Sequence, residues 1–127
     1  MREITSHKVV GNERNELFIG VTDEPGAGGA NHEYLVYSWP HLENLKCVLR
    51  TAEIKFQNGP IPVNGINGVT HEVLLAIVAD RLNSFQCGPY PCAENDMALH
   101  HVVQALNWLK QRTEDRIQRA VEGQLKA

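Results

Sequence analysis

The sequence contains no hydrophobic run long enough to cross a membrane. The apolar stretch at residues 73–79 is far shorter than the roughly 18 residues that a spanning helix needs. The chain also starts without an apolar leader, because residues 1–8 are charged and polar, and this excludes a secretory signal. Both absences predict a cytoplasmic protein with no membrane partner.

Cysteine and positive charge are both scarce. Three cysteines, an odd number, indicate the reduced thiols of a cytosolic protein rather than a disulfide framework. Twelve basic residues against fifteen acidic ones give a net charge of −3, which disfavours the broad basic surface that DNA binding needs. The sequence therefore predicts no DNA partner, although one local phosphate pocket stays compatible with it.

The first half of the chain has the pattern of short strands. Segments rich in β-branched or aromatic residues are separated by turn-forming residues, and they lie at residues 9–10, 17–21, 34–39 and 46–56. One antiparallel sheet is the simplest arrangement, because no connection is long enough for a crossover helix. Residues 58–68, dense in glycine, proline and asparagine, are interpreted as an ordered connector.

The second half changes to a helical period. A first helix is expected between a cap at Thr70 and a stop at residues 88–89. A second helix is expected from residue 91 or 92 to about residue 121, with Gly123 as its stop. Its apolar seam is formed by Leu99, Val102, Leu106, Leu109, Thr113 and Ile117.

The predicted fold class is α+β, with an N-terminal antiparallel β-sheet followed by a C-terminal antiparallel two-helix hairpin with a long last helix. One domain over residues 1–127 is expected, with a β-rich part at 1–63 and the hairpin at 64–127. The first helix would be roughly 22 Å long and the second roughly 45 Å. Because the shorter helix can cover only half of the longer one, the rest must pack on the sheet or on another subunit. We expect a homo-oligomer.

No motif for catalysis or metal binding stands out. The GAGG segment at residues 26–29 lacks the ending of a phosphate-binding P-loop and is interpreted as a hairpin loop. Cys87 and Cys92 precede His100 and His101, but adjacent histidines on a helix point about 100° apart and converge poorly on one metal. The two cysteines are interpreted as small core residues. The sequence predicts a non-enzymatic protein with no metal and no cofactor.

Two pairs of residues suggest ligand binding. Arg112 and Arg116 lie four residues apart, so they share a helix face, and the planar fork of arginine fits phosphate oxygens. The alternative is that they form salt bridges to Glu114, to Asp115 or to the sheet.

Phe85 and Asn95 flank the turn between the two helices. A ring in this position could stack on a base, which is worth about 1–3 kcal/mol, and an amide could read the edge of the base. On spacing alone the simpler interpretation is favoured: Phe85 is a core residue, and Asn95 belongs to the first turns of the second helix.

From residue 64 to residue 123 the chain resembles a phage hairpin domain. This domain is shared by Thoeris anti-defence proteins of the first type and by phage anti-CBASS sponges. The segments that carry the resemblance are GINGVT (65–70), LAIV (75–78), DRL (80–82), FQ (85–86), GPY (88–90), EN (94–95), AL (105–106), WL (108–109), RT (112–113), Arg116 and VEG (121–123). NHEY (31–34) and FQNGPI (56–61) extend it into the front half, as in the Thoeris group.

The resemblance implies a sponge, which binds an immune signalling nucleotide and holds it without cleaving it. For the Thoeris group the signal is a cyclic ADP-ribose isomer, and the family's ligand contacts fall on Phe85, Asn95, Arg112 and Arg116. Phe85 would stack on the adenine, and Asn95 would form a hydrogen bond with the polar edge of the ligand. Arg112 and Arg116 of a neighbouring subunit would clamp the pyrophosphate. The resemblance thus favours a binding role for Phe85 and Asn95.

The resemblance also implies a dimer or a hexamer and, in some relatives, a second pocket for cyclic trinucleotides. Ala120, in place of glycine, and Gln124-Leu125, in place of Thr-His, depart from the family in the tail and argue against the second pocket more than against the first. The alternatives are a sponge for cyclic di- or trinucleotides and an enzyme that degrades such signals. A helical interaction module such as a repressor is a third alternative, which the missing basic surface disfavours.

Overall fold

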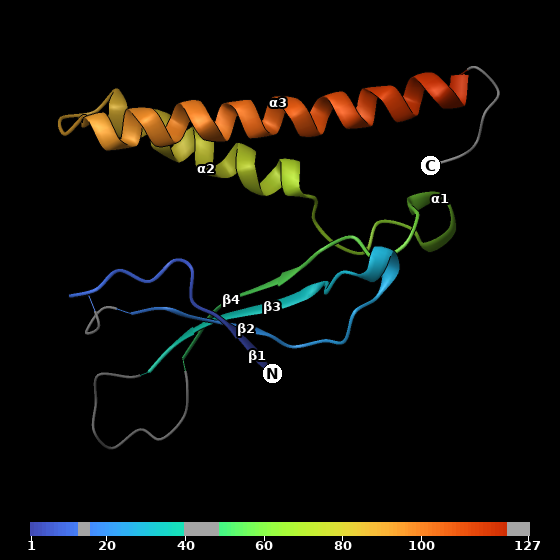
Figure 1. The fold of residues 1–127 in the computed structure, drawn as a ribbon, viewed down its shortest axis with the longest axis horizontal. Coiled ribbons are helices and arrows are strands. Elements are labelled where there is room, and N and C mark those ends of the chain that lie inside the picture. The colour runs from blue at the N-terminus through green and yellow to red at the C-terminus, as the bar shows by residue number, and fades with distance from the viewer. Residues whose placement is uncertain (13–15, 40–48, 122–127) are drawn as a thin grey trace. The chain divides into compact units, whose positions relative to one another are not determined.

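The computed structural model describes residues 1–12, 16–39 and 49–121, apart from the side chain of Val121. Contacts divide the chain into two compact units, Met1–Val69 and Thr70–Ala127. The first unit carries the sheet and the second the helical hairpin (Figure 1). The α+β fold class expected from the sequence is confirmed. The single-domain organisation, with its division after residue 63, stays a prediction.

The N-terminal unit is built on a four-stranded antiparallel sheet with the order β1-β2-β3-β4. Its strands are β1 (Arg2–Ile4), β2 (Phe18–Val21), β3 (Glu33–Ser38) and β4 (Leu49–Lys55). The register pairs Val21 with Tyr34 and Tyr34 with Ile54, so these side chains share one face of the sheet. Val21 is only 3% exposed, and the Phe56 ring meets Tyr34 edge-on at 5.6 Å between ring centroids.

Three of the expected strands are confirmed, and the expected strand at residues 9–10 is wrong. The confirmed ones coincide with β2, β3 and β4, although residues 46–48 lie outside the described residues. The first strand is instead β1, which pairs with β2. Three residues are too few for a two-residue period to be recognised in the sequence.

Asp23 closes the loop between β2 and β3. Its carboxylate accepts hydrogen bonds from the backbone N–H of His32 at 2.9 Å and of Glu33 at 3.1 Å. Burial raises the pKa of Asp23, but these two N–H groups, together with its own N–H and the Asn31 amide, outweigh that effect and hold the pKa below its usual value. The GAGG segment forms a short 3-10 turn, η2 (Ala27–Gly29), in this loop, as the hairpin interpretation predicts.

The connector after β4 is ordered by hydrogen bonds among Gln57, Asn58 and Asn67. The Asn67 amide accepts from the Asn58 N–H and donates to the Asn58 carbonyl, both at 2.8 Å. The Asn67 N–H donates to Oε1 of Gln57 at 3.0 Å. The ordered connector expected at residues 58–68 is confirmed, but it contains a short helix, α1 (Ile61–Asn64), that the sequence analysis does not anticipate.

The helical unit consists of α2 (His71–Gln86) and α3 (Ala93–Val121), which form the expected hairpin (Figure 1). The hydroxyl of Thr70 caps α2 by accepting a hydrogen bond from the Val73 N–H at 3.3 Å, as expected. Half-buried positions on α3 recur at intervals of three and four residues, and they are Asn95, Leu99, Val102, Leu106 and Leu109. Beyond them the expected seam is exposed, at Thr113 and Ile117.

Helix length explains where this seam ends. The 16 residues of α2 span about 24 Å and the 29 residues of α3 about 44 Å. α2 therefore has no residues with which to cover the last turns of α3. The expected stop at Gly123 and the Gln124-Leu125 departure lie outside the described residues.

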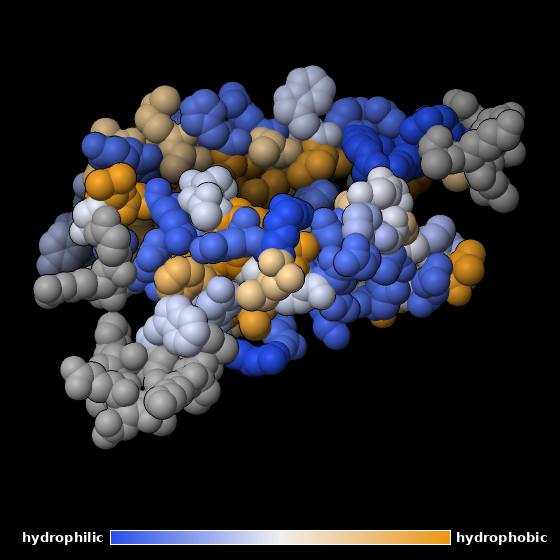
Figure 2. Space-filling view, turned by 60° about the horizontal axis from the view of Figure 1, so that its bottom comes forward, coloured by the Kyte–Doolittle hydropathy of each residue, from blue (hydrophilic) through white to orange (hydrophobic). Residues whose placement is uncertain are grey.

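Large apolar side chains stay exposed on the hairpin. Ile77 is 60% exposed, Trp108 76% and Ile117 59%. Apolar side chains, in orange, are visible among polar ones on the surface in Figure 2. Such exposure is more typical of an interaction surface than of an isolated hairpin. Within residues 1–12, 16–39 and 49–121, no helix is both long enough and apolar enough to cross a bilayer.

Candidate binding site at the hairpin turn

Hydrogen bonds brace the turn that joins α2 to α3. The Gly88 N–H donates to the Phe85 carbonyl at 3.2 Å and closes the end of α2. The side-chain amide of Gln86 then donates a hydrogen bond to the Cys92 carbonyl at 3.0 Å and accepts one from the Cys92 N–H at 3.1 Å. Sγ of Cys92 accepts from the Asn95 N–H at 3.5 Å, which caps the first turn of α3. The backbone of the turn is therefore fixed before any ligand binds.

Cys87 and Cys92 are free thiols, and both are exposed. Their interpretation as core residues is wrong, because the turn places them at the end of the hairpin rather than between its helices. In the described part of the chain, no three His, Cys, Asp or Glu side chains gather as a metal site would require.

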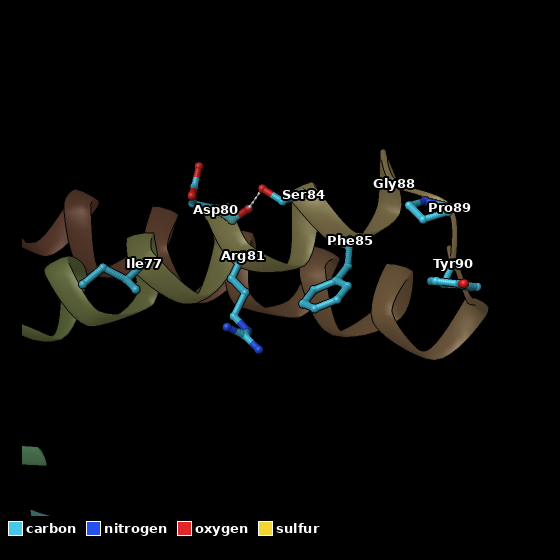
Figure 3. Close-up of a pocket in the computed structure, with 8 residues that line it drawn as sticks. All are labelled: Ile77, Asp80, Arg81, Ser84, Phe85, Gly88, Pro89 and Tyr90. Carbon is cyan, nitrogen blue, oxygen red and sulfur yellow. Dashed lines mark hydrogen bonds between the residues drawn. The ribbon is translucent and has the colours of Figure 1, made fainter. Parts of the chain in front are cut away.

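A hollow of about 610 Å³ opens beside this turn, a size that suits a small organic ligand (Figure 3). One face of α2 forms its long wall, because residues three or four apart on a helix lie on the same side. The turn forms its end. The lining residues are Ile77, Asp80, Arg81, Ser84, Phe85, Gly88, Pro89 and Tyr90.

The hollow combines aromatic rings with a cation. The guanidinium of Arg81 lies over the ring of Phe85, 5.2 Å from its centroid, in a cation–π contact. Among the described residues Arg81 has no ion pair. A planar group can therefore stack on a ring while an anionic group lies near the guanidinium.

Two of the residues singled out from the sequence lie at this end of the hairpin. Phe85 lines the hollow and is 46% exposed, so its interpretation as a core residue is wrong. Asn95 is half-buried in the first turn of α3, and no described residue hydrogen-bonds its side-chain amide. A ring and an unused amide therefore lie on the two sides of one braced turn.

Arg112 and Arg116 lie elsewhere, on the exposed distal part of α3. No carboxylate in the described ranges pairs with either of them, and Asp115 instead accepts a hydrogen bond from Gln111 at 2.9 Å. The helical rise puts Arg112 about 26 Å and Arg116 about 32 Å beyond Asn95 along the axis. One hairpin therefore does not bring the two arginines to Phe85.

Arg81 and Tyr90 line the hollow but are not among the site residues predicted from the sequence. Arg81 lies four residues before Phe85, one helical turn away, and this spacing alone would have placed both on one wall. Tyr90 follows a glycine and a proline in the turn, where no periodic pattern indicates which way a side chain points.

The fold and the hollow define a class of protein, an α+β chain whose helical hairpin carries an open aromatic and cationic site at its turn. Residues 49–114 match the family described as Acb2/Tad1, hairpin domain, and the chain belongs to this family. Among characterised proteins, Thoeris anti-defense 1 of Bacillus phage SBSphiJ7 is 46% identical over 74 residues. The match covers 58% of this chain and 52% of the relative, so the chain spans about half of that relative's length. The family resemblance noted from the sequence is confirmed.

Proposed function

We propose that the chain is a phage anti-defence sponge. It binds a cyclic ADP-ribose isomer in the bacterial cytosol during infection, holds it without cleavage, and so blocks activation of the Thoeris effector. The observation that carries the proposal is the half-exposed ring of Phe85 in a preformed hollow, with the guanidinium of Arg81 over that ring at 5.2 Å. The similarity to Thoeris anti-defense 1 supports this choice of signal.

The proposed ligand matches the chemistry of the four site residues. Phe85 stacks on the adenine, and the unused amide of Asn95 bonds its polar edge. Arg112 and Arg116 clamp the pyrophosphate, a role that suits two guanidinium groups without carboxylate partners in the described part of the chain.

The site requires a second copy of the chain. Arg112 lies about 26 Å along α3 from Asn95, farther than one side chain reaches, so the arginines of a site come from a neighbouring subunit. The exposed side chains of Trp108 and Ile117 on α3 supply apolar area for that contact. The proposal therefore includes a homo-oligomer, a dimer or a hexamer.

Binding without turnover fits the polar groups of the hollow. The hydroxyl of Ser84 donates to the backbone carbonyl of Asp80 at 3.0 Å (Figure 3), rather than to a histidine or carboxylate that would activate it as a nucleophile. A preorganised hollow that stacks and clamps a ligand provides affinity without providing a reaction path.

Calorimetric titration of the full chain with a panel of cyclic ADP-ribose isomers tests the proposal. The ligand is then released by denaturing the complex and identified by chromatography. We expect tight binding of one isomer and intact recovery. Phe85→Ala should weaken binding about 5- to 150-fold, the loss of one stacking contact. Arg116→Ala should weaken it about 10- to 100-fold, whereas Lys110→Ala, a cation on the same helix outside the pair, should leave it unchanged.

Three results would contradict the proposal, and each indicates a different protein. Binding of cyclic trinucleotides but of no cyclic ADP-ribose isomer indicates a sponge for cyclic oligonucleotides. Recovery of a cleaved product indicates an enzyme. If the chain binds no nucleotide at all, it is not a sponge.

A further inference from the structure

Tyr90 is displayed on a rigid turn without packing against the hairpin. Its side chain is 81% exposed, although it lines the hollow beside Phe85. Pro89 and Pro91 flank it, and the Gln86–Cys92 hydrogen bonds close the turn around it. An aromatic ring on a fixed backbone loses little conformational freedom when a ligand packs on it, so it is well suited to binding.

The two faces of the Phe85 ring are not equivalent. The guanidinium of Arg81 covers one face at 5.2 Å. In Figure 3 the three side chains lie in a row along the same hollow, with Phe85 between Arg81 and Tyr90, and the Tyr90 ring is seen edge-on. Neither Phe85 nor Tyr90 stacks on another ring in the described part of the chain. The two rings and the guanidinium therefore border one hollow that a planar group can enter.

We propose that the base of the ligand contacts both Phe85 and Tyr90 in this hollow, and that Arg81 remains over the ring of Phe85. This inference rests on the proposed function, because it takes the ligand to be a nucleotide. It assigns Tyr90 as a binding residue that contacts the base directly. Two rings make more contact area with a wide planar base than one ring does. Tyr90 therefore also favours a purine over a pyrimidine.

Titration of the full chain with the cyclic ADP-ribose isomer panel, using Tyr90 variants, tests the assignment. Tyr90→Ala should lower the affinity about 5- to 150-fold, the change expected for the loss of one base–ring contact. Tyr90→Phe keeps the ring and serves as the matched control, with an affinity within about twofold of the wild type. Because Tyr90 is exposed, circular dichroism should show the same fold for both variants.

A magnetic-resonance experiment detects the contact itself. The chain has three tyrosines, so a protein in which tyrosine rings alone are protonated has few possible sources of saturation transfer. Saturating these rings should transfer to the base protons of the bound ligand in the wild type. The transfer should disappear in Tyr90→Phe although the ligand still binds, which a purely structural role of Tyr90 would not produce.

The outcomes separate this inference from the proposed function. If Phe85→Ala loses binding while Tyr90→Ala keeps it, and no transfer reaches the base, the sponge stands and the role of Tyr90 is refuted. If the wild type binds no cyclic ADP-ribose isomer, the proposed function fails first, and the assignment of Tyr90 fails with it.

Discussion

Gln86 and Cys92 hold each other across the hairpin turn through two hydrogen bonds. Nε2 of Gln86 donates to the Cys92 carbonyl at 3.0 Å, and the Cys92 N–H donates to Oε1 of Gln86 at 3.1 Å. One side chain therefore satisfies both backbone groups of the residue that precedes α3. The clamp joins the end of α2, which carries Phe85, to the start of α3, which carries Asn95.

Replacing Gln86 by alanine should loosen this turn. Two net hydrogen bonds are lost, so we expect the helical unit to be destabilised by about 1–3 kcal/mol. Trp108 is the natural probe, and in a Trp39→Phe background it is the one tryptophan left in the chain. Urea unfolding followed by its fluorescence measures the change.

Gln104→Ala is the matched control for Gln86→Ala. Gln104 is an exposed glutamine on α3, and its loss should change stability by less than about 0.5 kcal/mol. Equal stability of the two variants would show that the clamp contributes nothing to the fold.

The backbone of Lys55 and Phe56 lies so close to Gly68 that we expect no side chain to be tolerated there. A Cβ at this position would overlap the carbonyl groups of Lys55 and Phe56, which are backbone atoms and cannot swing away. Gly68→Ala should cost about 1–3 kcal/mol or more, because the connector must separate from the end of β4. Unfolding in a Trp108→Phe background, followed by Trp39, reports on the sheet unit.

Gly65→Ala provides a useful comparison. Gly65 has a φ of 70° and a ψ of 178°, a backbone region restricted essentially to glycine, but no atom lies within 4 Å of an added Cβ, so alanine there adds conformational strain of about 1–3 kcal/mol without a clash. We expect Gly68→Ala to be the more destabilising of the two. The reverse order would mean that the backbone contact at Gly68 relaxes readily.

The sequence predicts the secondary structure well wherever a period is repeated often enough. The three-four seam of α3, as far as Leu109, and the Thr70 cap of α2 are found as expected. β1 and α1 are missed because three and four residues are too short to show a period. The connector is predicted as ordered, but its hydrogen bonds among Gln57, Asn58 and Asn67 depend on tertiary geometry.

The candidate site is harder to predict than the fold. Helical spacing places Phe85 on α2 but cannot tell a core face from a ligand face, and the structure makes the ring half-exposed. The direction of Tyr90 depends on how the turn is closed, and no local pattern records this. The expected helix lengths do show that the first helix covers only about half of the second, which is why an oligomer is expected from the sequence.

The pKa of Asp23 predicts an acid sensitivity of the sheet unit. Hydrogen bonds from the His32 and Glu33 N–H groups hold this pKa below its usual value in the folded chain. As the pH falls, Asp23 therefore takes up a proton in the unfolded state before it does so in the folded state. The contribution of Asp23 to the free energy of unfolding is lost between its usual pKa and its lowered pKa. In a Trp108→Phe background, Trp39 fluorescence against pH should show this loss.

Asp23→Asn should reduce that acid dependence, at the expense of a lower stability at neutral pH, because the amide cannot accept both hydrogen bonds as strongly. Glu24→Gln removes a neighbouring exposed carboxylate and should leave the acid transition in place. An acid transition that is identical in Asp23→Asn and in the wild type would exclude Asp23 as its cause.

The separation of Phe85 from Arg116 along the hairpin leads to a test of how a complete site is assembled. If each site takes its ring from one subunit and its arginines from another, Phe85→Ala and Arg116→Ala damage different halves of the site. Co-expressing the two variants as a dimer should restore about one quarter of the wild-type sites, since about half of the dimers are mixed and each mixed dimer has one intact site. Calorimetry of the mixture measures the number of sites, and each variant alone is the control. Strong binding in the mixture but in neither variant alone would require the site to span two chains. If mass spectrometry shows mixed dimers but strong binding is not restored, the whole site lies within one chain.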